Sequence, residues 1–193
     1  MPPKRKYLTA AEVEDMLAAA KNNSSPERNY CLLYMSFIHG FRVTELRNLQ
    51  LSDLSLKEGS LRINRLKQGF CTIHPLLEEE KEAIRLWLDV RRSMRGADSD
   101  WLFLSRQGKP LTRQRIYQII RMLGERARVE VPSHPHMLRH ACGFALADRG
   151  IDTRLIQDYL GHKNIRHTVR YTASNPARFR YVWAKKTNSK GYI

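Results

Sequence analysis

Apolar positions recur every three or four residues over most of the chain, which is the spacing of one face of an α-helix. Thr9-Ala10-Ala11-Glu12 forms a capping box, in which the hydroxyl and the carboxylate satisfy free N–H groups at a helix start. Pro26 suits the first turn of a second helix that stops at Gly40. Further helices are predicted at about 44–49, from 78 onward, where the acidic run Glu78–Glu82 opens a helix, and at about 112–128, 136–149, 153–160 and 165–171.

Only one region alternates between apolar and polar residues as a β-strand does. Leu61-Arg62-Ile63 alternates, Lys67-Gln68-Gly69 predicts a turn, and Phe70–His74 predicts the returning strand. The expected fold is therefore mainly α with a small antiparallel β-sheet, an α+β arrangement. At 193 residues the chain is long enough for one domain with a sizeable core.

The charge balance is unusual for a chain of ordinary composition. Lys and Arg number 34 against 19 Asp and Glu, which gives a net charge of +15. From Lys163 to the C-terminus there are eight Lys or Arg and no acidic residue, and 103–128 carries seven basic residues against Glu125 alone. Such a charge attracts polyanions, and nucleic acid is the one that a soluble protein meets most often.

The cysteines and the apolar runs exclude several classes of protein. Cys31, Cys71 and Cys142 are odd in number and far apart, so the sequence supports neither a disulfide framework nor a cysteine-based zinc site. No apolar run approaches the roughly 18 residues that a membrane span needs, and the N-terminus lacks the apolar stretch of a signal peptide. We expect a cytoplasmic, nucleoid-associated protein without a membrane partner.

The segment His134–Gly150 places three histidines and an arginine in its first seven positions. His136 and His140 are four residues apart and share a helical face, as in a zinc protease, but the protease motif needs a glutamate where Met137 stands. No third ligand lies at a suitable spacing, and Arg139 would place a fixed positive charge against the metal. We expect no metal. A core histidine would explain His140, whereas Arg139 needs an anionic partner or water.

Four further polar residues are ambiguous when each is taken alone. Arg42 in G-F-R-V-T-E-L, Lys67 in the predicted turn, His162 after a helix stop and Tyr171 all have ordinary structural explanations. Taken together with His136 and Arg139, they suit in-line attack on a phosphodiester.

The two arginines would hold the non-bridging oxygens of the phosphate. Arg42 and Arg139 carry planar guanidinium forks that match phosphate bidentately and would stabilise the extra charge of the pentacoordinate transition state. Tyr171 would be the nucleophile, with its cost of ionisation lowered by positive charge and a base. His136 and His162 would move protons or orient the phosphate, and Lys67 could protonate the leaving 5′ oxygen.

The same residues carry a family resemblance. The chain resembles the tyrosine recombinases, which include the phage integrases, Cre and the Xer proteins, over about residues 8–175. The similarity is greatest to the small invertases that flip a promoter segment controlling fimbriae. The resemblance rests on Arg42 in G-F-R-V-T-E-L, Lys67 eight residues before Pro75, His136-x-x-Arg139-His140, Leu160-Gly161-His162 and Tyr171-Thr172.

The resemblance implies a reaction and an assembly. Tyr171 would form a 3′-phosphotyrosine and release a 5′-hydroxyl, so that no ATP, metal or other cofactor is needed. Four subunits would act on two double-stranded inverted-repeat sites, with accessory DNA-bending proteins as further partners. The resemblance also divides the chain into a basic lead-in (1–8), the catalytic domain (9–174) and a basic tail (175–193), in which a helical stretch near Phe179–Trp183 would dock on a neighbour or simply pack.

Two departures from the relatives are visible in the sequence. Most relatives have an N-terminal domain that closes the DNA clamp, whereas this sequence starts at the catalytic domain, so the way it encircles DNA stays open. His140 is followed by Ala-Cys-Gly-Phe where many relatives have a small-residue Ala-Thr pattern. We expect that difference to lie away from the chemical groups and to affect helix packing.

Two other functions are compatible with parts of the pattern. A topoisomerase of the same chemistry would nick and reseal DNA as a monomer, and a non-catalytic regulator would only bind DNA. A regulator has no need for this set of residues at these mutual spacings. Candidate DNA-binding residues, whose arginines contact phosphate more often than bases, are Arg113, Arg115, Arg121, Lys163 and Arg166.

Overall fold

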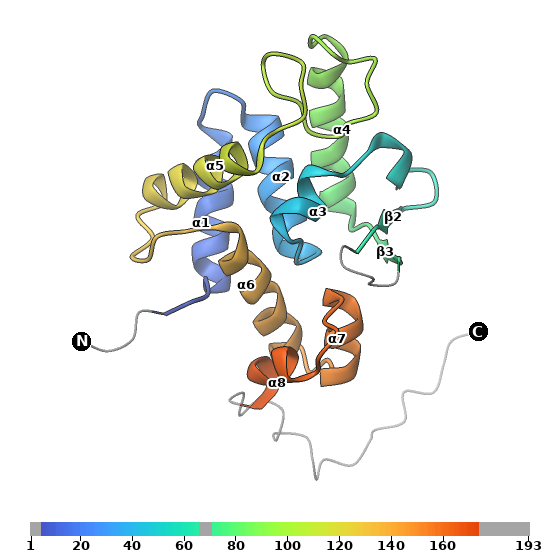
Figure 1. The fold of residues 1–193 in the computed structure, drawn as a ribbon. Coiled ribbons are helices and arrows are strands. Elements are labelled where there is room, and N and C mark those ends of the chain that lie inside the picture. The colour runs from blue at the N-terminus through green and yellow to red at the C-terminus, as the bar shows by residue number, and fades with distance from the viewer. Residues whose placement is uncertain (1–4, 66–70, 174–193) are drawn as a thin grey trace.

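The structure, a computed structural model, describes residues 5–65 and 71–173. Its helices cover most of the described chain (Figure 1). They are α1 (Ala10–Lys21), α2 (Pro26–Ile38), α3 (Val43–Arg47), α4 (Glu78–Arg92), α5 (Arg113–Arg126), α6 (Pro135–Asp148), α7 (Thr153–Leu160) and α8 (Arg166–Ala173).

The helices begin where the sequence predicts that they should. The Thr9 hydroxyl accepts a hydrogen bond from the Glu12 backbone N–H at 3.2 Å, and the Glu12 carboxylate accepts one from the Thr9 N–H at 2.8 Å. Pro26 occupies the first turn of α2, and the Thr112 hydroxyl caps α5. The capping box at Thr9, the proline at the start of α2 and the Thr112 cap therefore set these boundaries as expected.

A small antiparallel sheet accompanies the helices. Its strands β1 (Leu54–Ser55), β2 (Ser60–Ile63) and β3 (Thr72–Pro75) lie in that order. Leu61 on β2 pairs with His74 on β3, and both side chains are buried. The predicted fold class is confirmed, although the sequence did not predict β1, which at two residues is too short to show alternation.

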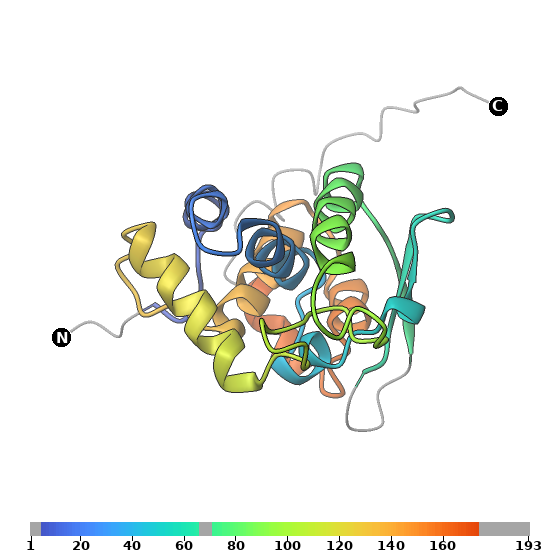
Figure 2. The same cartoon turned by 90° about the horizontal axis from the view of Figure 1, so that it is seen from above.

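The core has two parts. The larger cluster joins α1, α2, α4 and α5 to one face of the sheet, with Trp87 and Phe103 among its largest buried side chains. Figure 2 shows α4 between α2 and the sheet. The smaller cluster comprises Cys142, Ala147, Ile156, Leu160 and Tyr171, from α6, α7 and α8. Helix α6 joins the two, since it packs on α2 and carries α7 and α8 at its far end (Figure 1).

Some predictions fall on residues that the structure does not describe. The turn at Lys67-Gln68-Gly69 and the helical stretch near Phe179–Trp183 lie outside the described residues. Cys31 and Cys142 are buried, whereas Cys71 is exposed, and all three are free thiols. No helix within 5–65 and 71–173 is long and apolar enough to cross a membrane.

Candidate active site

Arg139 is held almost entirely by backbone carbonyl groups. It lies on α6 with 3% of its surface exposed. Its Nη1 donates to the Gly40 carbonyl at 2.5 Å, and its Nη2 donates to the Leu160 carbonyl at 2.6 Å. These bonds join α6 to the end of α2 and to the end of α7, and they fix the direction of the guanidinium group.

Arg42 lies beside the same chain segments. Its Nη1 donates to Glu45 Oε1 at 2.6 Å, and its Nη2 donates to the Gly161 carbonyl at 3.1 Å. The Glu45 carboxylate also accepts a bond from the Arg42 backbone N–H at 3.0 Å, which caps the start of α3. The side chain of Arg42 keeps 29% of its surface exposed, so it can still contact a ligand.

Glu45 is shared by three arginines. Its Oε2 lies 2.9 Å from Arg65 Nη1 and 4.0 Å from Arg139 Nη1, while Oε1 bonds Arg42. The three guanidinium charges face one carboxylate, so this buried cluster has two positive charges in excess. Such an excess is the arrangement expected of a site that receives an anion.

The ionisation of these groups follows from their burial. Burial raises the pKa of Glu45, but Arg65 and the neighbouring arginines outweigh it and hold that pKa below its usual value. Burial and the charge of Arg42 lower the pKa of Arg139 to about 10. Glu45 and Arg139 are thus both charged at neutral pH.

Tyr171 is completely buried, with 0% of its surface exposed. Its hydroxyl lies 2.8 Å from His140 Nδ1, and the His162 ring stacks on the phenol ring at 6.2 Å. Burial raises the pKa of the phenol, while the charges of Arg139 and Arg170 act in the opposite direction. The predicted nucleophile therefore lies next to the arginine cluster, but in a protonated and enclosed form.

The segment that follows His140 contacts Tyr171 directly. A Cβ atom on Gly143 would lie 2.5 Å from Cε2 of the phenol ring, and the Phe144 ring packs edge-on at 5.1 Å. The expectation that Cys142–Phe144 lies away from the chemical groups is therefore wrong. The absence of a side chain at Gly143 makes room for the ring of Tyr171.

His162 is placed by the end of α7. Gly161 caps that helix in the left-handed conformation, with φ 64° and ψ 47°, which glycine adopts without strain. His162 Nδ1 then lies 2.9 Å from the Thr168 hydroxyl. Burial, followed by the charges of Arg139 and Arg42, lowers the pKa of His162 to about 3, so the imidazole is neutral at physiological pH.

The two other histidines are also neutral. Burial lowers the pKa of His140 to about 4, with Arg170 as the next cause, so its neutral ring can accept a hydrogen bond from the Tyr171 hydroxyl. His136 is largely exposed on the first turn of α6. The partial burial of its side chain, followed by neighbouring charges that include Arg139 and Arg42, lowers its pKa. The structure thus gathers five of the six residues predicted to be catalytic, and Lys67 lies outside the described residues.

An open groove of about 490 Å³ runs from α5 to His136. Tyr117 and Arg121 line its α5 side, and His134 lines the side of the α5–α6 connection. The predicted DNA-binding residues are all exposed: Arg113, Arg115 and Arg121 on α5, and Lys163 and Arg166 near the start of α8. Of these five, Arg121 borders the groove that contains His136.

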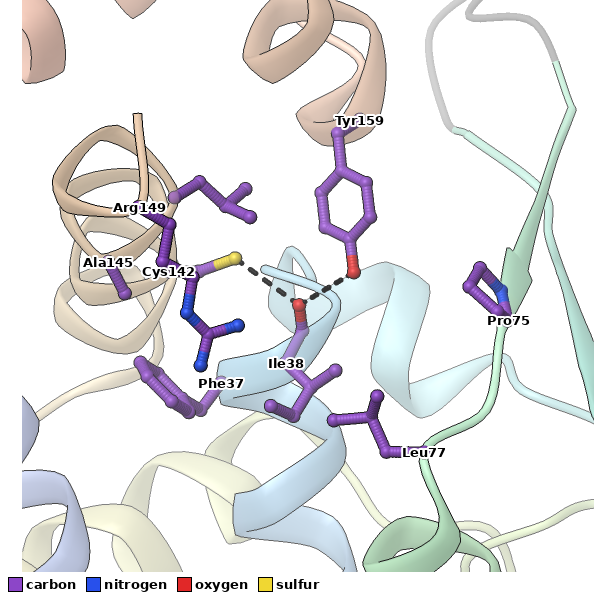
Figure 3. Close-up of a pocket in the computed structure, with 9 residues that line it drawn as sticks. Phe37, Ile38, Pro75, Leu77, Cys142, Ala145, Arg149 and Tyr159 are labelled. Carbon is purple, nitrogen blue, oxygen red and sulfur yellow. Dashed lines mark hydrogen bonds between the residues drawn. The ribbon is translucent and has the colours of Figure 1, made fainter. Parts of the chain in front are cut away.

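A second, mostly apolar pocket of about 110 Å³ lies on another face of α6 (Figure 3). Phe37, Leu77 and Leu146 are among its lining residues. At its base the Ile38 carbonyl accepts hydrogen bonds from Cys142 Sγ and the Tyr159 hydroxyl (Figure 3). Within the described ranges, no group of three or more His, Cys, Asp or Glu side chains could hold a metal ion.

Sequence reasoning missed two residues of the site. Glu45 stands three residues after Arg42, which is the spacing of a capping box, so its contact with Arg42 had a visible signal. Arg65 continues the alternation of Leu61 and Ile63, and an arginine at an inward position of a strand is a signal of a buried contact. No sequence pattern indicated that its partner would be Glu45, 20 residues earlier.

The chain belongs to the phage integrase family, whose model matches residues 6–178. It is 56% identical over 180 residues to the type 1 fimbriae regulatory protein FimB of Escherichia coli (strain K12), covering 93% of this chain and 90% of that protein. It is 33% identical over 182 residues to the tyrosine recombinase XerD of Halalkalibacterium halodurans, covering 93% of this chain and 60% of that protein.

Solved structures share the fold. The crystal structure of XerA recombinase has a TM-score of 0.80 and 33% identity, covering 93% of this chain and 64% of that one. The XerH recombinase bound to its difH substrate matches with a TM-score of 0.77 and 23% identity, and this chain covers 55% of it. The chain therefore spans between half and two thirds of these solved proteins.

Proposed function

We propose that this protein is a site-specific DNA recombinase that inverts a promoter segment controlling fimbrial genes. The observation that carries the proposal is that Tyr171 stacks on His162 at 6.2 Å and lies close enough to Arg139 for that charge to oppose the rise of its pKa. Fimbrial regulation is supported by the 56% identity to FimB over nearly the whole chain. The partner is double-stranded DNA, and its phosphates fit the charge excess around Glu45.

The reaction joins the phenol to the DNA backbone. The Tyr171 oxygen attacks the scissile phosphorus, and the bond from phosphorus to the 5′ oxygen breaks. Arg42 and Arg139 hold the non-bridging oxygens, where they stabilise the charge of the transition state. The bond energy stays in the 3′-phosphotyrosine linkage, so the free 5′-hydroxyl of a partner strand can reverse the step.

The reaction needs one group to take the phenol proton and another to protonate the leaving 5′ oxygen. In the enclosed conformation the neutral His140 ring lies 2.8 Å from the phenol hydroxyl and holds it by a hydrogen bond; once the phenol reaches the phosphate, the neutral His136 or His162 takes its proton. Lys67 protonates the leaving 5′ oxygen, while His136 and His162 orient the phosphate. General acid–base help of this kind contributes about 10²–10⁴-fold to a rate.

Tyr171 must leave its pocket before it can attack. With 0% of its surface exposed, the phenol cannot touch a duplex in the described conformation. Helix α8 is two turns long and packs on α6 and α7. A shift of α8 on DNA binding would carry the phenol towards the phosphate held by Arg42 and Arg139.

Recombination requires an assembly larger than one chain. We propose four subunits on two inverted-repeat sites, with residues 9–174 as the catalytic domain and the tail 175–193 contacting a neighbouring subunit. The tail contains apolar and basic residues together, including Phe179 and Trp183. Accessory DNA-bending proteins would help to bring the two sites together.

The decisive experiment is covalent trapping on nicked duplexes whose recognition sequences the protein has first selected from a random-sequence pool. The nick lets the short cleaved strand diffuse away, so the wild type should accumulate a denaturant-resistant protein–DNA adduct. Tyr171→Phe should bind the same DNA with similar affinity and form no adduct. An adduct formed by Tyr171→Phe would contradict the assignment of the nucleophile.

Separate experiments test the two arginines that hold the phosphate, Arg42 and Arg139, and the type of reaction. Arg42→Ala and Arg139→Ala should each lower the rate of adduct formation by about 10²-fold or more, as expected when a transition-state donor is lost. Two selected sites placed in opposite orientation around a marker should invert it. Relaxation of supercoiled plasmids that lack the sites, without any inversion, would indicate a topoisomerase instead.

A further inference from the structure

Tyr7 lies in the short segment before α1 and contacts the helix that carries Arg139. Its ring packs on the ring of Phe144 on α6, with 4.3 Å between the ring centroids and 41° between the ring planes. Leu8, the next residue, is 1% exposed and belongs to the larger core cluster. The segment before α1 is therefore fixed to the molecule at two adjacent residues.

Arg5 gives the Tyr7 ring a second contact. Its guanidinium carbon lies 5.4 Å from the centroid of that ring, which is within the range of a cation–π interaction. The same guanidinium group forms an ion pair with Glu12 in the first turn of α1. The ring of Tyr7 thus connects the start of α1 to α6.

Phe144 also contacts the proposed nucleophile. Its ring meets the phenol ring of Tyr171 edge-on, with the centroids 5.1 Å apart and the planes at 78°. The rings of Tyr7, Phe144 and Tyr171 therefore form a continuous series of contacts from the segment before α1 to the nucleophile. Each aromatic contact of this kind favours the packed arrangement by about two- to tenfold beyond the area that it buries.

The pocket of Tyr171 has no spare room, so the phenol can leave only if a wall moves. The phenol is 0% exposed, and the backbone at Gly143 lies so close that an added Cβ atom would be 2.5 Å from the ring. Phe144 is only partly buried, so its side chain has space for a different rotamer. While Tyr7 packs on Phe144, that change of rotamer costs the contact between the two rings.

We infer that Tyr7 is a positioning residue that keeps Tyr171 in its pocket by holding Phe144, and so limits how often the phenol reaches the phosphate. The inference rests on the proposed function, in which Tyr171 leaves its pocket before it attacks. Without the Tyr7 ring, a larger fraction of the chains has the phenol released. The covalent step is then faster by the same factor, because only a released phenol can attack.

The first test measures the exposure of the Tyr171 phenol in the absence of DNA. N-acetylimidazole acetylates accessible tyrosine hydroxyls, and mass spectrometry of the peptides locates the acetyl groups. Tyr7→Ala should raise the rate of acetylation at Tyr171 by about two- to tenfold, whereas Tyr7→Phe, which keeps the ring, should match the wild type. Tyr7→Leu decides the matter if Tyr7→Ala does not fold.

Tyr159 is the internal reference for this measurement, because its hydroxyl is bonded to the Ile38 carbonyl. Its rate of acetylation should be the same in all the variants. Equal increases at Tyr159 and Tyr171 would show a general loosening of the fold and would overturn the inference. An unchanged rate at Tyr171 in Tyr7→Ala would overturn it as well.

A double-mutant cycle tests whether the effect passes through Phe144. Phe144→Leu should raise acetylation of Tyr171, and adding Tyr7→Ala to it should bring no further increase, since the connecting ring is already absent. Additive effects of the two changes would contradict this route. Tyr30→Ala is the matched control: it removes another partly buried tyrosine, which stacks on Tyr34 at 5.9 Å, and should leave Tyr171 unchanged.

The second test measures adduct formation on the selected nicked duplex at a saturating DNA concentration. Tyr7→Ala should form adduct faster by the factor found for acetylation, and Tyr7→Phe should form it at the wild-type rate. Faster acetylation with an unchanged rate of adduct formation would overturn the inference. Failure of the proposed function is distinguishable, because an adduct formed by Tyr171→Phe would remove the nucleophile and leave the acetylation results as they are.

Discussion

Gly143 is the position where one added methyl group would meet the predicted nucleophile. A Cβ atom there would lie 2.5–2.7 Å from three ring atoms of Tyr171, closer than side chains pack. The ring lies in a cluster of buried side chains from three helices and has little room to move aside. A side chain at position 143 therefore fits only when the phenol ring is out of its pocket.

Gly143→Ala should destabilise the protein by about 1–3 kcal/mol, as expected for overpacking a core. Urea denaturation measures the change. Tyr171→Ala removes the ring, so in a double-mutant cycle Gly143→Ala should lose most of its cost in that background. An equal cost in both backgrounds would show that the strain arises elsewhere.

At the scale of residues, the sequence indicated which candidate catalytic groups lie near one another better than it indicated the groups that hold them. Arg42, Arg139 and Tyr171 are unusual by residue type and spacing, and the structure brings them together. Glu45 and Arg65 meet only because the fold brings the segment just after β2 to α3, which no local pattern encodes. Sequence motifs report chemistry, whereas the hydrogen bonds that orient the chemistry depend on tertiary contacts.

At the scale of elements, a buried histidine pair joins β3 to two helices. His39 Nδ1, just after α2, lies 3.1 Å from His74 Nδ1 on β3, and His39 Nε2 lies 2.7 Å from Glu80 Oε1 on α4. Burial, followed by the charges of His39 and Arg65, lowers the pKa of His74 from 6.5 to about 3. These contacts attach the edge of the sheet to the core.

The lowered pKa of His74 predicts a loss of stability in mild acid. Below pH 6.5 the unfolded chain takes up a proton on this histidine, and the folded chain does not until about pH 3. The stabilisation is therefore complete above pH 6.5 and decreases as the pH falls, by about 2 kcal/mol between pH 7 and pH 5. Urea denaturation at both pH values should show a smaller decrease for His74→Gln than for the wild type.

The matched control is Ile73→Gln, which changes an exposed residue without a titratable group next to His74 on the same strand. It should leave the difference in unfolding free energy between pH 7 and pH 5 unchanged. If His74→Gln also left that difference unchanged, the proton uptake would belong to another group.

Elements were predicted with success where a physical rule acts locally. The capping box before α1, the proline at the start of α2 and the left-handed glycine after α7 set boundaries within a few residues of those observed. Strand β1 was missed because its two residues pair through a neighbouring strand and carry no periodicity of their own. Boundaries set by local hydrogen bonds were predicted, whereas a strand that forms only through non-local hydrogen bonds was missed.

At the scale of the whole molecule, the net charge of +15 predicts how DNA binding responds to salt. Each phosphate neutralised by a basic side chain releases a condensed counterion, so the logarithm of the affinity should fall linearly with the logarithm of the salt concentration. Arg121→Gln should weaken binding and reduce that slope by about 1, because Arg121 borders the groove near His136. Titrations at several salt concentrations measure the slope.

Arg92→Gln provides the control for the salt experiment. Arg92 is exposed on α4 and is paired with Asp89, much as Arg121 is paired with Glu125, so both changes remove one charge from a surface ion pair. Only the change at Arg121 should alter the slope. Equal effects of the two variants would mean that overall charge, and not the groove, accounts for the attraction.

The surplus of guanidinium groups around Glu45 has a consequence for the protein before it meets DNA. Two uncompensated positive charges at one place attract small anions from the buffer, so we expect the arginines around Glu45 to bind such anions in solution. A DNA phosphate that binds these arginines would then displace sulfate, phosphate or chloride. The composition of the medium, as well as its ionic strength, thereby sets how readily a backbone phosphate enters.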